Sequence, residues 1–208
     1  MGTSSAGQPA TVVFDVGKVL IEWDPRHLYR KVFDDPERME WFLENVCSNT
    51  WNLEQDRGRP WPQAEQLLID QHPDFVDEIR LFRRRWREMV PYAVDDSVAV
   101  LQDLLDAGVP LYAITNFAAD TFREAQDIYP FLTRFRGIVC SGEIGAIKPD
   151  PVIYRRLAEL HGVDLRTALF IDDSQRNVDG SKAAGMPAIL FTDGPTLRRD
   201  LRQLGLAV

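Results

Sequence analysis

The carboxylate of Asp15 is the group in this chain that most clearly suggests chemistry. It follows the apolar run from Thr11 to Phe14 and precedes a second apolar segment that ends at Leu20. A carboxylate at the end of a buried strand is costly unless it has a partner or a function. A turn or N-cap role would explain the residue type, but it would not explain the apolar strand before it. We therefore take Asp15 as the candidate nucleophile.

Three later segments supply groups that could act with Asp15. They are Thr115-Asn116, Lys148 before Pro149, and Asp172-Asp173. Two adjacent carboxylates repel one another unless a cation compensates, and Mg²⁺ prefers carboxylates together with waters and phosphate oxygens. A lysine ahead of a helix N-terminus is well placed for an anion. Together these groups suit phosphoryl transfer through an aspartyl-phosphate, although a Thr-Asn pair often only turns the chain and Asp173 could also be an N-cap.

Apolar strands alternate with helical patterns along most of the chain. The expected strands are residues 11–16, 109–115, 137–141, 168–172 and 187–191, and the expected helices are residues 95–107, 119–128, 150–161, 175–184 and 195–204. This alternation predicts an α/β fold, a Rossmann-like parallel sheet covered by helices. Ligands of such sheets bind beyond the carboxyl ends of the strands, where Asp15, Thr115 and Asp172 fall.

Residues 24–94 lack a strong strand pattern and are too long for an ordinary crossover connection. They read as helices over residues 26–33, 36–48, 63–71 and 73–90. We therefore expect an all-helical cap at residues 24–94, inserted into a core made of residues 1–23 and 95–208. All five tryptophans lie in this insertion or at its edge: Trp23, Trp41, Trp51, Trp61 and Trp86. They either build a small core of their own, or one or two of them line a substrate pocket that faces Asp15.

Composition limits the classes of partner. The chain has 208 residues and a formal net charge of −8, which argues against a nucleic acid as the main ligand but leaves small phosphorylated molecules open. Cys47 and Cys140 do not form a CxxC motif, so two reduced buried thiols are expected. No apolar run reaches membrane-spanning length, and residues 1–10 lack the apolar region of a signal peptide. We expect no membrane partner and a cytoplasmic location.

Four motifs in this order are typical of one family. They are Phe14-Asp15-Val16-Gly17, Thr115-Asn116, Lys148-Pro149-Asp150-Pro151 and Ile171-Asp172-Asp173-Ser174. The chain resembles the haloacid dehalogenase (HAD) superfamily, in its phosphatase-like branch with a helical cap after the first strand, a branch that includes bacterial sugar-1-phosphate phosphatases. The resemblance covers nearly the whole chain, from Thr11 to Leu204.

The resemblance implies a Mg²⁺ site. Asp15 would be both the nucleophile and a metal ligand, and the backbone carbonyl of Gly17 would be a second ligand. Asp173 would bind the metal directly, and Asp172 would bind it directly or through a water molecule.

The resemblance also implies how the phosphoryl group is held. Thr115 and the Asn116 amide would bind its oxygens. Lys148 would neutralise charge on Asp15 and on the transferring group, as the approach of an anionic nucleophile to an anionic phosphate requires.

One residue departs from the pattern of most phosphatases of this superfamily. They carry a second aspartate two residues after the nucleophile as general acid and base, and this chain has Gly17 there. Glycine cannot protonate a leaving group, so the proton would come from elsewhere, with Glu22 and Asp24 as conjectural donors, or the leaving group would need little protonation. General acid help is typically worth ~10²–10⁴-fold, so slow turnover is expected.

The function expected from these features is Mg²⁺-dependent hydrolysis of a small phosphomonoester, with a sugar phosphate as one candidate. The first alternative is a 2-haloacid dehalogenase, which needs no metal and also lacks the second aspartate, but the pair Asp172-Asp173 argues against it. The second alternative is a non-catalytic binding module, which Gly17 alone supports. The partner would be a small phosphorylated metabolite, and the oligomeric state is left open.

Overall fold

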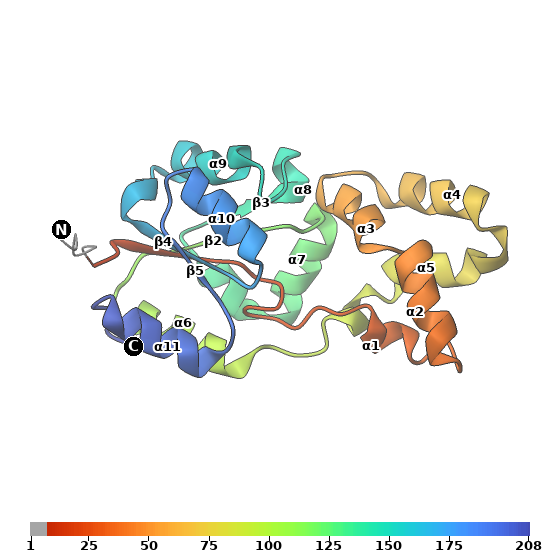
Figure 1. Ribbon diagram of the computed structural model, residues 1–208, viewed down its shortest axis with the longest axis horizontal. Coiled ribbons are helices and arrows are strands. Elements are labelled where there is room, and N and C mark those ends of the chain that lie inside the picture. Colours follow the sequence, from red (N-terminus) through yellow and green to blue (C-terminus); the bar gives the residue numbers. More distant parts are fainter. Residues whose placement is uncertain (1–7) are drawn as a thin grey trace.

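The computed structural model describes residues 8–208, and a five-stranded parallel sheet surrounded by helices forms the left-hand part of the molecule in Figure 1. The strands are β1 (Thr11–Phe14), β2 (Leu111–Thr115), β3 (Gly137–Cys140), β4 (Ala168–Asp172) and β5 (Ala188–Leu190). Their order is β3-β2-β1-β4-β5, and every pairing is parallel. Since β1 is the central strand, Asp15 leaves the sheet at its middle. Residues 1–7 of the expected core segment lie outside the described residues.

Helices cover both faces of this sheet, as the α/β prediction requires. The helices after the insertion are α6 (Asp95–Asp106), α7 (Ala119–Ile128), α8 (Ser141–Ile144), α9 (Pro151–His161), α10 (Gln175–Ala183) and α11 (Gly194–Gln203), with short 3₁₀ helices at Pro130–Arg134 and Leu165–Thr167. Alternate residues of β1 face opposite sides. Val13 packs in one core with Tyr154 and Val178, and Val12 packs in another with Leu101 and Leu197.

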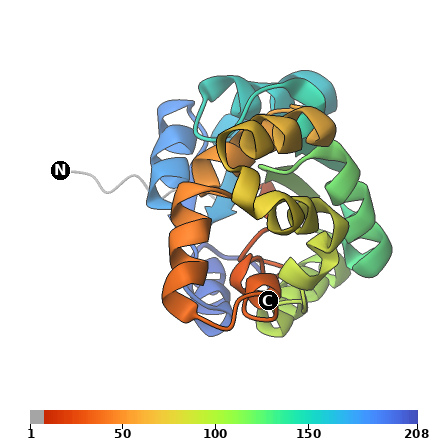
Figure 2. The same cartoon turned by 90° about the vertical axis from the view of Figure 1, so that its right-hand side faces the viewer.

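The segment between β1 and β2 forms helices and stands to one side of the sheet (Figures 1 and 2). Its helices are α1 (Arg26–Tyr29), α2 (Pro36–Asn45), α3 (Asn49–Asp56), α4 (Trp61–Gln71) and α5 (Val76–Arg84), with 3₁₀ helices at Pro73–Phe75 and Trp86–Met89. Its aromatic residues Tyr29, Phe42 and Phe82 pack together, within the same hydrophobic cluster that contains Val12 and Leu101. We call this segment the helical insertion.

The chain enters and leaves the helical insertion along two adjacent paths. The Glu22 amide donates to the Tyr92 carbonyl at 2.9 Å, and the Asp24 amide donates to the Met89 carbonyl at 2.9 Å. These paired paths support the limits at residues 24 and 94, which remain our proposal for the cap.

Helix α3 was absent from the sequence prediction, which ended a long helix at Ser48. In the structure α2 stops at Asn45, and Ser48 begins the next helix because its hydroxyl accepts a hydrogen bond from the Trp51 amide at 3.2 Å. The predicted helix over residues 73–90 is likewise broken, with α5 ending at Arg84. Within residues 8–208, none of the helices combines the length and apolarity that crossing a bilayer demands.

Candidate active site

A buried lysine joins the ends of the neighbouring strands β1 and β4. The Nζ atom of Lys148 lies 2.6 Å from Asp15 Oδ1 and 2.8 Å from Asp172 Oδ2, and only 1% of the lysine side chain is exposed. Asp15 Oδ1 also accepts a hydrogen bond from the Val16 amide at 2.7 Å. Strand β1 pairs with β4 in parallel, so the two carboxylates leave the sheet at the same edge. The structure thus brings together residues that are far apart in the sequence.

Burial dominates the electrostatics of this cluster. It raises the pKa of Asp15 well above the usual value, the Lys148 ammonium opposes that shift, and Asp172 adds to it. Burial alone would lower the pKa of Lys148, but Asp15 and Asp172 more than offset this, so its pKa is raised. A positive charge is therefore held permanently beside the candidate nucleophile.

Asp173 adds a third carboxylate to the cluster. Asp15, Asp172 and Asp173 each offer an oxygen atom, and these atoms all lie within 4.8 Å of one another. One lysine cannot balance three carboxylates, and carboxylate oxygens are the ligands that Mg²⁺ prefers. Asp172 is fully buried and accepts hydrogen bonds from the Ser174 amide at 2.8 Å and from Asn177 Nδ2 at 3.0 Å, whereas Asp173 is exposed. The donor set fits a divalent cation, with Asp173 as the acid that is free to bind it.

Thr115 and Asn116 at the end of β2 differ in what they contact. The Thr115 hydroxyl is buried and has no hydrogen-bond partner among the described residues, and Thr115 is absent from the residues that line the cavity described below. The Asn116 side chain is already used, because its Oδ1 accepts from the Lys148 amide at 2.8 Å and its Nδ2 donates to the Lys148 carbonyl at 3.3 Å. Asn116 therefore holds the backbone that carries the buried lysine.

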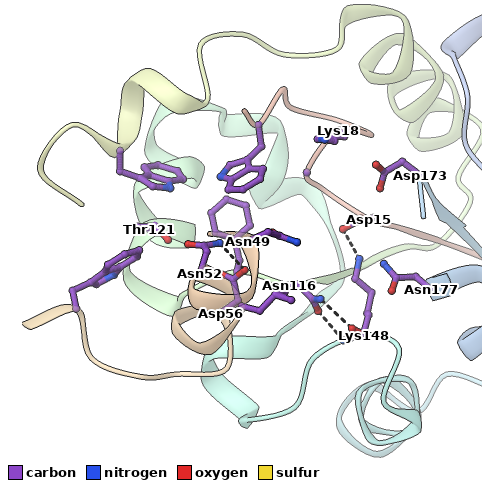
Figure 3. Close-up of a pocket in the computed structure, with 16 residues that line it drawn as sticks. Asp15, Lys18, Asn49, Asn52, Asp56, Asn116, Thr121, Lys148, Asp173 and Asn177 are labelled. Atoms are coloured by element: carbon purple, nitrogen blue, oxygen red, sulfur yellow. Dashed lines mark hydrogen bonds and ion pairs between the residues drawn. The ribbon is translucent and has the colours of Figure 1, made fainter. Parts of the chain in front are cut away.

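A cavity of about 250 Å³ opens from this cluster toward the helical insertion (Figure 3). Asp15, Gly17, Lys148 and Asp173 line its floor, and the remaining lining residues are Lys18, Trp23, Asn49, Asn52, Leu53, Asp56, Trp61, Trp86, Asn116, Phe117, Thr121 and Asn177. Three of the five tryptophans, Trp23, Trp61 and Trp86, line the cavity, which favours the pocket alternative and exceeds the one or two residues it named. Trp51 packs inside the helical insertion, and 48% of Trp41 is exposed.

Several cavity residues were not expected to belong to the site. Lys18 has a φ of 61°, a left-handed conformation that side chains seldom adopt outside turns and functional sites. Asn177 lies in the first turn of α10, four residues after Asp173, and this short spacing is a signal in the sequence that could have identified it. Asp56 ends the helix that the sequence prediction missed, and no pattern marks it.

The two conjectured proton donors do not line this cavity. Glu22 and Asp24 are both absent from its lining residues, and Asp24 pairs with Arg26 at 3.3 Å.

Comparison with known proteins places the chain in a family. The model for haloacid dehalogenase-like hydrolases matches residues 9–185. The chain is 26% identical over 193 residues to the sesquiterpene phosphatase astK of Aspergillus oryzae, covering 92% of this chain and 94% of that protein. The HAD family enzyme bt-2542 of Bacteroides thetaiotaomicron, solved with magnesium and inorganic phosphate, superposes with a TM-score of 0.68 at 20% identity, covering 88% of this chain and 94% of that one.

The L-2-haloacid dehalogenase of Xanthobacter autotrophicus shares the fold as well, with a TM-score of 0.63 at 18% identity over 96% of this chain and 85% of that one. Likeness at this level of identity shows the fold alone. The family match covers most of the chain, so the protein belongs to the haloacid dehalogenase-like hydrolases, as the four motifs suggested.

Proposed function

We propose that the protein is a Mg²⁺-dependent phosphatase that hydrolyses a small phosphomonoester through an aspartyl-phosphate on Asp15. The observation that carries the proposal is the charge balance of the cluster. A lysine between Asp15 and Asp172 neutralises part of the charge, and the exposed carboxylate of Asp173 completes a cation site beside the nucleophile. The relative from Aspergillus oryzae, named as a phosphatase, supports the same reaction class.

Each residue of the cluster has a distinct role in this proposal. Asp15 Oδ attacks the phosphorus atom, Lys148 balances charge on the phosphoryl oxygens, and the Thr115 hydroxyl would donate a hydrogen bond to one of them. Asp15, the Gly17 carbonyl and Asp173 would hold Mg²⁺, with Asp172 behind them. The metal would supply positive charge where two anions must meet.

The cavity also limits the leaving group. Among the residues that line it, the cations are Lys18 and Lys148, and the second is already shared by two carboxylates. Apart from the acids, the other walls are tryptophans, Phe117, Leu53, Thr121 and side-chain amides. A leaving group with a second negative charge would find only Lys18 to compensate it, and Asp56 would repel it. We therefore favour a substrate whose leaving group is an uncharged alcohol with a ring or apolar body. A sugar phosphate, whose leaving group is the sugar, remains one candidate.

Phosphate release with and without metal tests the proposal. The purified protein is incubated with a panel of alkyl, aryl and sugar phosphates, in Mg²⁺ or in excess chelator, beside the Asp15→Asn variant. We expect phosphate release in Mg²⁺ alone and none from the variant, because asparagine keeps the shape but not the nucleophile. Halide release from 2-chloropropionate without metal would instead establish the dehalogenase. A folded protein that turns over neither substrate class would contradict the proposed reaction and favour the binding module.

A further inference from the structure

The absence of an acid at Gly17 leaves the proposed reaction without an obvious proton donor. A β-carbon built on Gly17 meets nothing within 4 Å, and its φ is not positive, so neither space nor backbone geometry requires glycine there. The acidic residues that line the cavity are Asp15, Asp56 and Asp173. Asp15 is the nucleophile and Asp173 belongs to the cation site. Asp56 is the acid for which the reaction so far has no use.

Asp56 belongs to the helical insertion, but it is hydrogen-bonded to the sheet domain, by which we mean the parallel sheet and the helices that cover it. Its Oδ1 accepts a hydrogen bond from the Ala118 amide at 3.1 Å, and its backbone carbonyl accepts one from Ser141 Oγ at 2.5 Å. Ala118 and Ser141 follow the ends of β2 and β3. The Asp56 carboxyl is therefore positioned relative to the catalytic edge of the sheet.

The second carboxyl oxygen of Asp56 faces the cavity side of α3. Its Oδ2 accepts a hydrogen bond from Asn52 Nδ2 at 3.2 Å, and Asn52 itself lines the cavity. Figure 3 shows Asp56 beside Asn52, and in that view Asn116 lies between Asp56 and Lys148. A leaving group that extends from the phosphoryl site toward the helical insertion passes this wall.

The surroundings of Asp56 favour its protonated form near neutral pH. Burial raises its pKa from 3.8 to about 7, while the Ala118 amide and Lys148 oppose the shift. From the sheet domain the groups that face it are Lys148 and the Cys140 thiol, whose own pKa burial raises to about 12. On its own helix, Glu54 pairs with Arg57 at 3.6 Å on the exposed side. An acid that is half protonated near neutral pH suits proton transfer in both directions.

We propose that Asp56 is the general acid and base of the reaction and takes the place of the aspartate that Gly17 lacks. This inference rests on the proposed phosphatase function. In the first step Asp15 bonds to phosphorus, the bond from phosphorus to the leaving oxygen breaks, and that oxygen takes the proton of Asp56. In the second step a water molecule attacks phosphorus and gives a proton to the Asp56 carboxylate. The Asp15–phosphorus bond then breaks, which returns both carboxyl groups to their starting state and releases inorganic phosphate.

A purely structural role would have Asp56 serve only as an acceptor for the Ala118 amide. Asp56→Asn separates the two roles, because asparagine keeps an oxygen for that amide but has no acidic proton. Wild type and variant are compared by kcat/KM on an alkyl phosphate, whose leaving group needs a proton, and on 4-nitrophenyl phosphate, whose leaving group departs as a stable anion. Glu54→Gln is the matched control, because Glu54 is an acid of the same helix that pairs with Arg57 at 3.6 Å on the exposed side and is absent from the residues that line the cavity.

We expect Asp56→Asn to lose ~10²–10⁴-fold on the alkyl phosphate and far less on the aryl phosphate. Adding Gly17→Asp to this variant should restore part of the alkyl activity, because it returns an acid to the position where related phosphatases carry theirs. Equal losses on both substrates in Asp56→Asn, or the same selective loss of alkyl activity in Glu54→Gln, would overturn the assignment.

The pH profile gives a second test that needs no variant. For the wild-type protein, kcat/KM on the alkyl phosphate should fall as the pH rises through about 7, since Asp56 then loses the proton it must donate. The kcat/KM on the aryl phosphate should show no such falling limb at high pH. Identical limbs for both substrates would refute the role of Asp56 even if Asp56→Asn fails to fold. If the wild type releases no phosphate from either substrate in Mg²⁺, the proposed function itself fails, which is a different result from all of these.

Discussion

Replacing Lys148 with methionine should cost the protein much of its stability when no metal is present. The lysine is fully enclosed and neutralises Asp15 and Asp172 at 2.6 and 2.8 Å. Without it, Asp172 keeps its bonds from Ser174 and Asn177, but Asp15 keeps only the Val16 amide. Removing one partner of a buried ion pair costs ~3–5 kcal/mol, because the other charge is left uncompensated.

Urea unfolding in excess chelator measures this loss. Lys31→Met is the control, because Lys31 pairs with Glu88 at 2.7 Å but 56% of its side chain is exposed, and such surface pairs contribute only ~0–1 kcal/mol. Mg²⁺ should recover part of the stability of Lys148→Met, since a ligand at 100 times its Kd stabilises the folded state by about 2.7 kcal/mol. Equal m-values, the slopes of the unfolding free energy against urea concentration, would show that the variants expose similar surface on unfolding. A loss in Lys148→Met no larger than in Lys31→Met would refute the account of the buried charge cluster.

Two further predictions concern the acids of the site. Asp173→Asn should weaken Mg²⁺ binding, measured by calorimetry, more than Asp172→Asn does, because Asp172 is enclosed by protein donors while Asp173 is exposed; the reverse order would exchange their roles. Because the pKa of Asp56 rises from 3.8 to about 7 on folding, its contribution to stability is present below about pH 4 and is lost as the pH rises to about 7. Asp56→Asn should therefore be more stable than the wild type in thermal melts at pH 8 but not at pH 4. If the difference in Tm between variant and wild type is the same at both pH values, the raised pKa is contradicted.

The sheet and its catalytic edge could be predicted because both follow from local patterns. Apolar runs that end in polar residues mark buried parallel strands, and parallel strands bring their carboxyl ends to one edge. This is why Asp15, Thr115 and Asp172 were expected to lie together. Their partner Lys148 was expected from its place before a helix and from the family motifs.

The helical insertion was predicted less well, and with it the cavity walls. Helix α3 contains few apolar residues in a regular spacing, so its N-cap residue, Ser48, is the one local signal for it. The sequence prediction places Ser48 at the end of the previous helix instead. Asp56 could not be recognised from the sequence because its pKa is raised by burial, and that burial depends on packing against residues such as Ala118, 62 positions away in the chain. The left-handed backbone of Lys18 likewise depends on the turn that follows β1.

Trapping the covalent intermediate tests the central claim most directly. The protein is mixed with a phosphomonoester and Mg²⁺, quenched in acid within a single turnover, digested, and examined by mass spectrometry. A phosphoryl group should appear on Asp15, and it should be absent in chelator and in Asp15→Asn. Phosphate release without any phosphoryl group on Asp15, or with one on another residue, would contradict the proposed mechanism.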